Sequence, residues 1–213
     1  MPAYYARPAG VQRPPIILVL MEIFGLHEFI KDVTRRLGHL GSFAVAPDYY
    51  FRMEDLTKIG DMQELLPKVN SKTDTQLFAD LDATVAWAKS RGGDGNRLGV
   101  RGFCRGGRNV WHYSAHNPNL KAGAAFYGSI ELAPEVKEPV LGLYGAEDTG
   151  IKVEQVKEME AALKAAGKTA EFKIYPGAPH GFHADYRPSY RKEAAEDAWN
   201  QMISWFKKNN VLS

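Results

Sequence analysis

The chain has 213 residues, of which 45% are hydrophobic and 24% are charged, and its formal net charge is +2. This length and apolar content predict a single α/β domain, residues 1–213, with a sizeable buried core. The small net charge, without a basic run or stripe, excludes nucleic acid as an expected partner.

The first residues carry no apolar signal core, and no later apolar run is long enough to span a membrane. We therefore expect a cytoplasmic protein with no membrane partner. Residues 3–6 are expected to form an edge strand, and a turn rich in glycine and proline follows up to residue 15.

Two strongly apolar runs, 16–21 and 43–48, predict buried parallel strands. The amphipathic pattern over 29–40 predicts a helix between them, which makes one β-α-β unit. The stretch 49–74 is mixed and contains Pro67 and several polar residues. We expect a loop with one short helix there.

The remaining elements continue the alternation. Helices are expected over 76–89, 108–116, 153–167 and 193–208, and strands over 98–103, 121–128, 140–145 and 170–175. This order predicts the α/β class, with a mostly parallel, doubly wound sheet flanked by helices. Ligands bind outside the carboxyl ends of the strands in such sheets, so residues just after strands are candidate site residues.

The strand over 98–103 ends in a Gly-x-Cys-x-Gly-Gly corner around Cys104. A reactive side chain at a tight strand-to-helix turn needs very small residues two positions before and after it, and Gly102 and Gly106 fill these positions. Cys104 is therefore the candidate nucleophile. It is the only cysteine, so it forms no internal disulfide and favours a reducing compartment. The alternative is an inert buried thiol.

Two other strand ends carry residues that could assist a nucleophile. Asp148 follows the predicted strand 140–145, and His180 lies in a glycine- and proline-rich loop after strand 170–175. A nucleophile, an acid and a histidine in this chain order match the order used by α/β-hydrolases. His180 would accept the thiol proton and Asp148 would orient the imidazole. Alternatively, Asp148 is a turn former or a helix cap, and His180 is a surface or core residue without a chemical role.

The end of the strand over 16–21 contributes a third location. In this architecture the loop after that strand gives one N–H of the oxyanion hole and the residue after the nucleophile gives the other, which indicates Ile23 and Arg105. Glu22 ends a fully apolar strand, where an unpaired buried carboxylate costs several kcal/mol. We therefore expect the Glu22 side chain to face the site.

Six short motifs support one family resemblance. They are Glu22-Ile23-Phe24-Gly25, Ala46-Pro47-Asp48-Tyr49-Tyr50, Gly102-Phe103-Cys104-Arg105-Gly106-Gly107, Phe126-Tyr127-Gly128, Gly145-Ala146-Glu147-Asp148 and His180-Gly181-Phe182. Together they resemble the dienelactone hydrolase family of α/β-hydrolases, also known as carboxymethylenebutenolidases, from about residue 3 to the closing helix. A cysteine nucleophile with a Glu-Ile-Phe-Gly loop is quite specific to that family.

The resemblance implies a hydrolase without a cofactor, acting on a small-molecule lactone or enol ester. Its triad would be Cys104, His180 and Asp148, and the reaction would pass through an acyl-thioester. In the family, the carboxylate that matches Glu22 contacts the cysteine in the resting enzyme and helps to generate the thiolate when substrate binds. A free thiol is mostly protonated near neutral pH, so some such device is required.

The chain departs from the family pattern in the residues that bind the substrate carboxylate. Family members that act on dienelactone hold its carboxylate with two arginines, one on the helix after the Pro-Asp-Tyr strand and one four residues beyond the catalytic histidine. Here no arginine lies between positions 52 and 91, and Ala184 is the residue four beyond His180. The candidates to replace them are Arg187, Arg52, Lys68 and Lys72. Relative to the family, the chain is also expected to lack the first edge strand.

Several alternatives remain at this stage. Tyr127, Phe24 and Tyr50 are candidates to line the substrate pocket, although aromatic residues near strand ends more often belong to the core. The pairs His180/His183 and His112/His116 have spacings that suit a metal, but no third ligand is evident, so we expect none.

Two other functions compete with lactone or ester hydrolysis. One is a thioesterase or acyltransferase with the same site chemistry. The other is a non-catalytic member of the fold that uses Cys104 as a redox-sensing thiol. No helical seam for self-association is visible in the sequence, so we expect a monomer.

Overall fold

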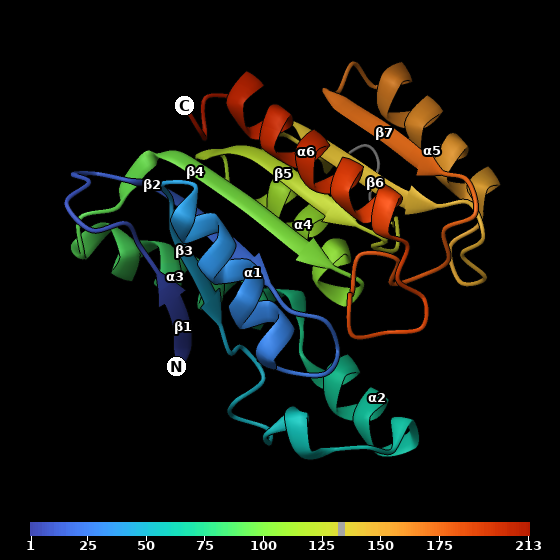
Figure 1. Ribbon diagram of the computed structural model, residues 1–213, viewed down its shortest axis with the longest axis horizontal. Coiled ribbons are helices and arrows are strands. Elements are labelled where there is room, and N and C mark those ends of the chain that lie inside the picture. Colours follow the sequence, from blue (N-terminus) through green and yellow to red (C-terminus); the bar gives the residue numbers. More distant parts are fainter. Residues whose placement is uncertain (132–134) are drawn as a thin grey trace.

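A computed structural model describes residues 1–131 and 135–213 (Figure 1). Its centre is a seven-stranded sheet in the order β1-β3-β2-β4-β5-β6-β7. The strands are β1 Ala3–Ala6, β2 Pro15–Leu20, β3 Phe43–Pro47, β4 Asp94–Phe103, β5 Leu120–Phe126, β6 Val140–Gly145 and β7 Ala170–Tyr175. Only the edge strand β1 runs antiparallel to its neighbour, so the predicted mostly parallel, doubly wound sheet is confirmed.

Helices cover both faces of this sheet. They are α1 Glu28–His39, α2 Met62–Ser71, α3 Asp74–Ser90, α4 Arg105–His116, α5 Val153–Ala165 and α6 Lys192–Lys208, with a 3₁₀ turn η1 at Leu56–Lys58. Helices α1 and α6 lie over the face of the sheet that is toward the viewer in Figure 1, and α3 and α4 lie behind it. The alternation along β4 explains this: a side chain at Gly99 would meet Phe206 of α6, whereas one at Gly102 would meet α4.

The core is made of the apolar runs identified in the sequence. All six residues of β2 and all five of β3 are buried, as expected for central strands covered on both faces. The helices of the described residues include none that is both long enough and apolar enough to cross a membrane.

Several boundaries differ from the prediction. Helix α3 begins at Asp74 and not at residue 76, because Thr73 and Gln76 form a capping box before the apolar pattern starts. Helix α4 begins directly after Cys104, three residues earlier than expected. Strand β5 ends at Phe126, because Tyr127 takes a left-handed conformation with φ 39°. The stretch 49–74 holds the one expected helix, α2, and Pro67 lies inside it.

Candidate active site

Cys104 occupies the sharp corner between β4 and α4. Its backbone has φ 53° and ψ −116°, an unusual conformation for a residue with a side chain, and its N–H donates to the Phe126 carbonyl at 2.9 Å. A Cβ on Gly102 would collide with the carbonyl oxygen of Gly106, and one on Gly106 would collide with that of Leu20. Strand, helix and β2 can therefore meet at this corner only because both positions are glycine.

The loops after β6 and β7 bring Asp148 and His180 together. One carboxylate oxygen of Asp148 lies 2.6 Å from Nδ1 of His180. The other accepts hydrogen bonds from the N–H groups of Gly150 at 2.8 Å and Ile151 at 3.0 Å. Asp148 is only 5% exposed, so its carboxylate is held in one orientation.

The charges at this pair depend on one another. Burial alone would raise the pKa of Asp148, but the hydrogen bond from His180 and the two backbone N–H groups lower it below its usual value. Burial also disfavours protonated His180, yet the interactions with Asp148 and with Cys104 outweigh it and raise the pKa of His180 to about 10. Asp148 and Cys104, the other two residues expected in the triad, are thus both close enough to His180 to raise its pKa.

Glu22 is fully buried at the end of β2 and has three polar partners. Its Oε2 lies 3.1 Å from Nε2 of His27 and accepts a hydrogen bond of 3.0 Å from the Tyr186 hydroxyl. Its Oε1 lies 3.2 Å from Nη2 of Arg187 and forms an ion pair with it, but it has no hydrogen bond within the described residues. These partners compensate for the loss of hydration, as a buried carboxylate requires.

The family resemblance implied a different partner for Glu22. Within the described residues, the polar contacts of Glu22 run to His27, Tyr186 and Arg187, and none runs to Cys104. Two of these partners, Tyr186 and Arg187, belong to the loop that follows His180.

Two backbone N–H groups were expected to form the oxyanion hole. Arg105 is the first residue of α4, so its N–H is one of those with no acceptor inside the helix. Ile23 directly follows Glu22, and the Tyr49 hydroxyl fixes the end of β2 by donating to the Met21 carbonyl at 2.9 Å. Their role stays a prediction, because it depends on where the substrate oxygen lies.

The three aromatic residues expected in a substrate pocket differ in position. Tyr127 is fully buried, with its ring centre 5.0 Å from that of His180, so it packs under the imidazole. Tyr50 is also buried, and burial raises its pKa to about 12. The Arg105 guanidinium opposes this rise, and the nearby Cys104 adds to it. Phe24 is half-buried and lines an open cavity.

That cavity has a volume of about 320 Å³. It is lined by Phe24, His27, Leu56, Thr57, Ile59, Tyr186 and Arg187. Three of these residues contact Glu22, so the cavity leads to the buried carboxylate. The Arg187 guanidinium also stacks on the Phe24 ring, 4.8 Å from its centre.

The structure separates the four candidates for a substrate-binding cation. Arg52 and Lys72 both pair with Asp80, and Lys68 pairs with Glu54. Arg187 lines the cavity beside Glu22. Burial alone would lower the pKa of Arg187, but the Glu22 carboxylate raises it, so the guanidinium is charged.

His27 and Tyr186 contact Glu22, and neither was predicted as a site residue. His27 lies in the stretch that follows Glu22, and a histidine five residues after a buried acid was a usable signal. Tyr186 lies six residues beyond His180, and its contact with Glu22 depends on the loop conformation. Nothing in its spacing indicates that contact.

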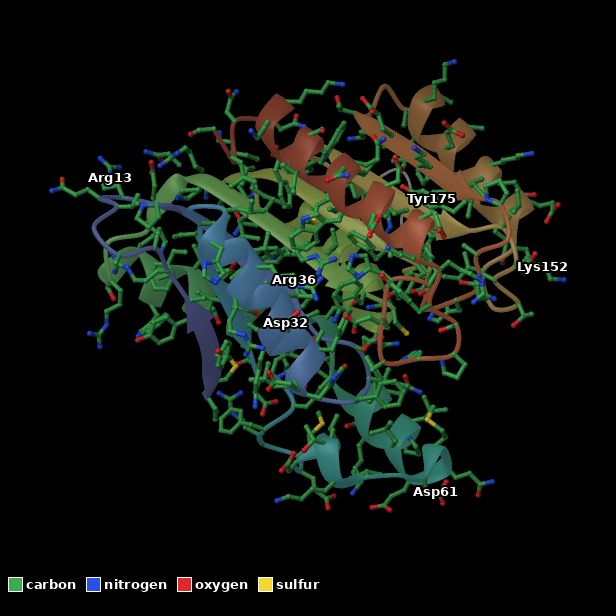
Figure 2. The ribbon with its side chains drawn as sticks, in the orientation of Figure 1. Arg13, Asp32, Arg36, Asp61, Lys152 and Tyr175 are labelled. Atoms are coloured by element: carbon green, nitrogen blue, oxygen red, sulfur yellow. The ribbon has the colours of Figure 1, made fainter. Side chains whose placement is uncertain are left out.

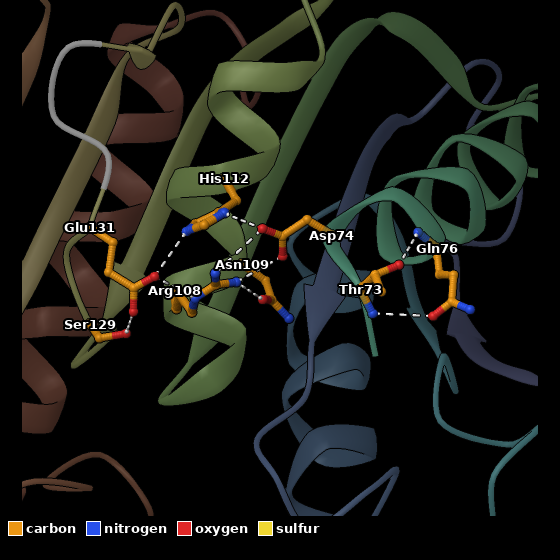
Figure 3. Close-up of polar contacts among 8 residues, drawn as sticks. All are labelled: Thr73, Asp74, Gln76, Arg108, Asn109, His112, Ser129 and Glu131. Atoms are coloured by element: carbon orange, nitrogen blue, oxygen red, sulfur yellow. Dashed lines mark hydrogen bonds and ion pairs between the residues drawn. The ribbon is translucent and has the colours of Figure 1, made fainter. Parts of the chain in front are cut away.

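The histidines that were considered as metal ligands make other contacts. His183 is buried, 5.2 Å from the Phe103 ring between centres. His112 binds Asp74 at 2.9 Å within a network with Arg108 and Glu131 (Figure 3), and His116 contacts Asp82. Residues 1–131 and 135–213 contain no group of three or more His, Cys, Asp or Glu side chains placed to hold a metal ion.

The sequence is similar to a known protein family and to several of its members. The model of the dienelactone hydrolase family matches residues 1–210. A protein of Methylorubrum extorquens, provisionally named a carboxymethylenebutenolidase, is 49% identical over 226 residues, covering 99% of this chain and 78% of that protein. A Yersinia pestis protein with the same provisional name is 44% identical, covering 99% of this chain and 85% of its own length.

A solved structure is similarly close. The crystal structure of a provisionally assigned dienelactone hydrolase from Klebsiella pneumoniae aligns with a TM-score of 0.95 at 45% identity. The alignment covers 98% of this chain and 93% of that chain. These similarities therefore extend over nearly the whole sequence.

Proposed function

The chain belongs to the dienelactone hydrolase family, has the α/β-hydrolase fold and is a hydrolase of ester or lactone bonds, and from this premise we propose that Cys104, His180 and Asp148 act as its catalytic triad. The observation that carries the proposal is the position of His180. It lies 2.6 Å from a buried Asp148 carboxylate, and the nearby Cys104 contributes with Asp148 to its raised pKa. This is the order of contacts that nucleophilic catalysis needs.

The proposed reaction has two steps. The Cys104 thiolate, whose proton has passed to Glu22, attacks the acyl carbon, and the carbon–oxygen bond to the leaving oxygen breaks as protonated His180 gives that oxygen a proton. In a lactone the leaving oxygen stays attached to the acyl chain, so the ring opens. Water then gives a proton to His180 and its oxygen attacks the thioester, which releases the carboxylic acid and Cys104. The N–H groups of Ile23 and Arg105 would stabilise the oxyanion in both steps.

We assign Glu22 a role in forming the thiolate. A carboxylate that leaves its present partners could accept the thiol proton, because Glu22 lies at the end of the strand next to the one that carries Cys104. Arg187 is the partner that a substrate could compete for, since it lines the open cavity. Binding of substrate and activation of the nucleophile would then be linked.

The cavity also suggests the substrate class. An arginine beside an aromatic wall suits a small unsaturated ester or lactone that carries a carboxylate. Dienelactone-like substrates fit this description without the two arginines that the family pattern uses. The lone cysteine favours a reducing compartment, which supports a cytoplasmic enzyme, and we propose that it acts as a monomer.

The experiment mixes the purified protein with chromogenic esters and with unsaturated lactones, with and without a carboxylate, beside Cys104→Ala and Glu22→Gln. We expect turnover by the wild type, none by Cys104→Ala, and acyl mass on the peptide that contains Cys104. Glu22→Gln should still form that adduct, but slowly. The thioester route would be contradicted if Cys104→Ala lost turnover but the wild type formed no adduct on Cys104.

The same samples test the two other functions. A preference for long-chain acyl thioesters over lactones would indicate a thioesterase or acyltransferase. Selective oxidation of Cys104 by peroxide without turnover of any ester would indicate a redox sensor.

A further inference from the structure

Arg101 is a buried cation on β4, three residues before the proposed nucleophile. Its side chain is 0% exposed, and its three guanidinium and amino nitrogens, Nε, Nη1 and Nη2, have no hydrogen-bond partner in the described part of the chain. The guanidinium lies 3.7 Å from the centre of the Phe103 ring and 4.4 Å from that of Phe126. Aromatic faces stabilise a cation only in part, and they leave all of its N–H groups unsatisfied.

Arg101 keeps its charge in this position. Burial lowers the pKa of Arg101 to about 9, which is still two units above neutral pH. The charge of Glu22 favours protonated Arg101, but Glu22 makes no hydrogen bond to the guanidinium and already contacts Arg187, His27 and Tyr186. A buried charge whose N–H groups lack acceptors is strongly destabilising, so an anion next to the guanidinium would stabilise the fold.

A cavity of about 270 Å³ lies on the same side of the sheet. It is lined by Arg36 of α1, by residues of α6 that include Trp199 and Glu196, and by His183 and Asp185 from the connecting loop. Trp199 and His183 also belong to the aromatic surroundings of Arg101: the guanidinium lies 5.9 Å from the Trp199 ring, and His183 packs on Phe103. These two side chains connect the inner end of the cavity to the guanidinium.

His183 offers a second unsatisfied group at this end. Its Nδ1 is buried and has no partner among residues 1–131 and 135–213. Burial and the nearby Arg101 and Arg36 guanidinium groups lower the pKa of His183 well below its usual value, so the ring is neutral. A neutral imidazole donates one N–H, which suits an acceptor placed between the two residues.

We propose that a small monovalent anion, of the size of chloride or formate, binds at the inner end of this cavity between Arg101 and His183. The mouth of the cavity determines the charge of the ligand. Arg36 projects from α1 there (Figure 2), and it is already paired with Asp32 at 2.6 Å and with Asp185 at 3.4 Å. The carboxylates of Asp185 and Glu196 line the same opening and disfavour an anion with two charges.

Anion-dependent stability tests this site without relying on hydrolase activity. Thermal unfolding is followed at fixed ionic strength while sodium bromide, or sodium formate, replaces sodium gluconate. We expect the Tm of the wild type to rise in a saturable way, by about 3–5 °C at tenfold excess over the Kd, because the ion binds only the folded state. Arg101→Met should remove the response, whereas Arg13→Met, which removes the same charge from an exposed residue, should retain it.

A second measurement does not depend on any variant. Crystals of the wild type soaked in bromide should show an anomalous peak next to the Arg101 guanidinium. Equal responses of the three proteins to bromide and to formate, or water molecules next to the guanidinium after soaks in either salt, would overturn the proposal. A response to formate but not to bromide would identify the ligand as a carboxylate.

Discussion

Arg187 and Glu22 lie 3.2 Å apart, and the carboxylate is fully buried while the guanidinium forms part of the wall of an open cavity. The pair therefore connects a buried acid near the proposed nucleophile to a surface that a substrate can reach. A substrate carboxylate that takes Arg187 would leave Glu22 with only His27 and Tyr186 as partners.

Replacement of Arg187 by Met should separate substrates by charge. We expect KM to rise about 10–100-fold for esters or lactones that carry a carboxylate, since a hydrogen bond to a charged group contributes about 1.5–3 kcal/mol. KM for neutral esters should stay within about twofold. Steady-state kinetics on a matched pair of substrates measure the difference. Arg52→Met is the control, because Arg52 pairs with Asp80 and does not line this cavity. An equal loss for both substrates would show that Arg187 only supports the fold.

The Asp148→Asn variant should keep the fold and lose catalysis. The amide oxygen can still accept from the N–H groups of Gly150 and Ile151, but the amide N–H₂ would face Nδ1 of His180 and favour the wrong tautomer. We expect kcat to fall about 10³–10⁴-fold with a nearly unchanged KM. The pKa of His180, measured by NMR, should fall in the same variant because its main charged partner is gone. A loss of kcat below about tenfold would remove Asp148 from the triad.

The stability of the protein should fall from neutral to alkaline pH in a way that depends on His180. The pKa of His180 is about 10 in the folded chain, against 6.5 as its ordinary value, so the folded state holds more protons between these two pH values. Its contribution to stability is complete below pH 6.5 and is lost as the pH rises to 10. Urea unfolding at pH 6, 8 and 10 should show a steeper loss for the wild type than for His180→Asn. Parallel curves would contradict the raised pKa.

Small residues at the nucleophile corner should be indispensable. A methyl group at Gly106 would lie 2.4 Å from the carbonyl oxygen of Leu20, which is too close, and Leu20 belongs to the central strand β2. We expect Gly106→Ala to lower the free energy of unfolding by more than about 3 kcal/mol or to prevent folding. Gly60→Ala is the matched control, because nothing lies within 4 Å of its added Cβ, and it should change stability by less than about 0.5 kcal/mol. Urea midpoints that shift equally would mean that the backbone adapts at this corner.

The sequence was sufficient for the features that depend on parallel strands. The carboxyl ends of β4, β6 and β7 meet at one edge of the sheet, so residues placed just after them, Cys104, Asp148 and His180, had to approach one another. Strand positions were predictable for the same reason, since buried parallel strands are continuous apolar runs. Helix α3 was placed two residues late, because a capping box is polar and lies outside the apolar pattern.

Contacts made by loops could not be predicted in this way. Tyr186 reaches Glu22 from 164 positions away, and its place depends on how the loop after His180 turns. Arg101 is a similar case: hydropathy favours an exposed arginine, yet β4 is covered on both faces and leaves its side chain no path to water. Both features depend on tertiary packing, which cannot be predicted from the residue pattern of a single strand or loop.

The loop from His180 to Arg191 contributes residues to the proposed triad, to the surroundings of Glu22 and to the proposed anion site. It carries the proposed general base, two of the three partners of Glu22, and His183 of the proposed anion site. Directed evolution in this loop would therefore change substrate preference and nucleophile reactivity together, and most variants selected for one would alter the other. The opposite wall of the cavity, at Leu56, Thr57 and Ile59, contacts none of these groups through a hydrogen bond or ion pair in the described structure, so it is the better place for libraries that aim at a new substrate.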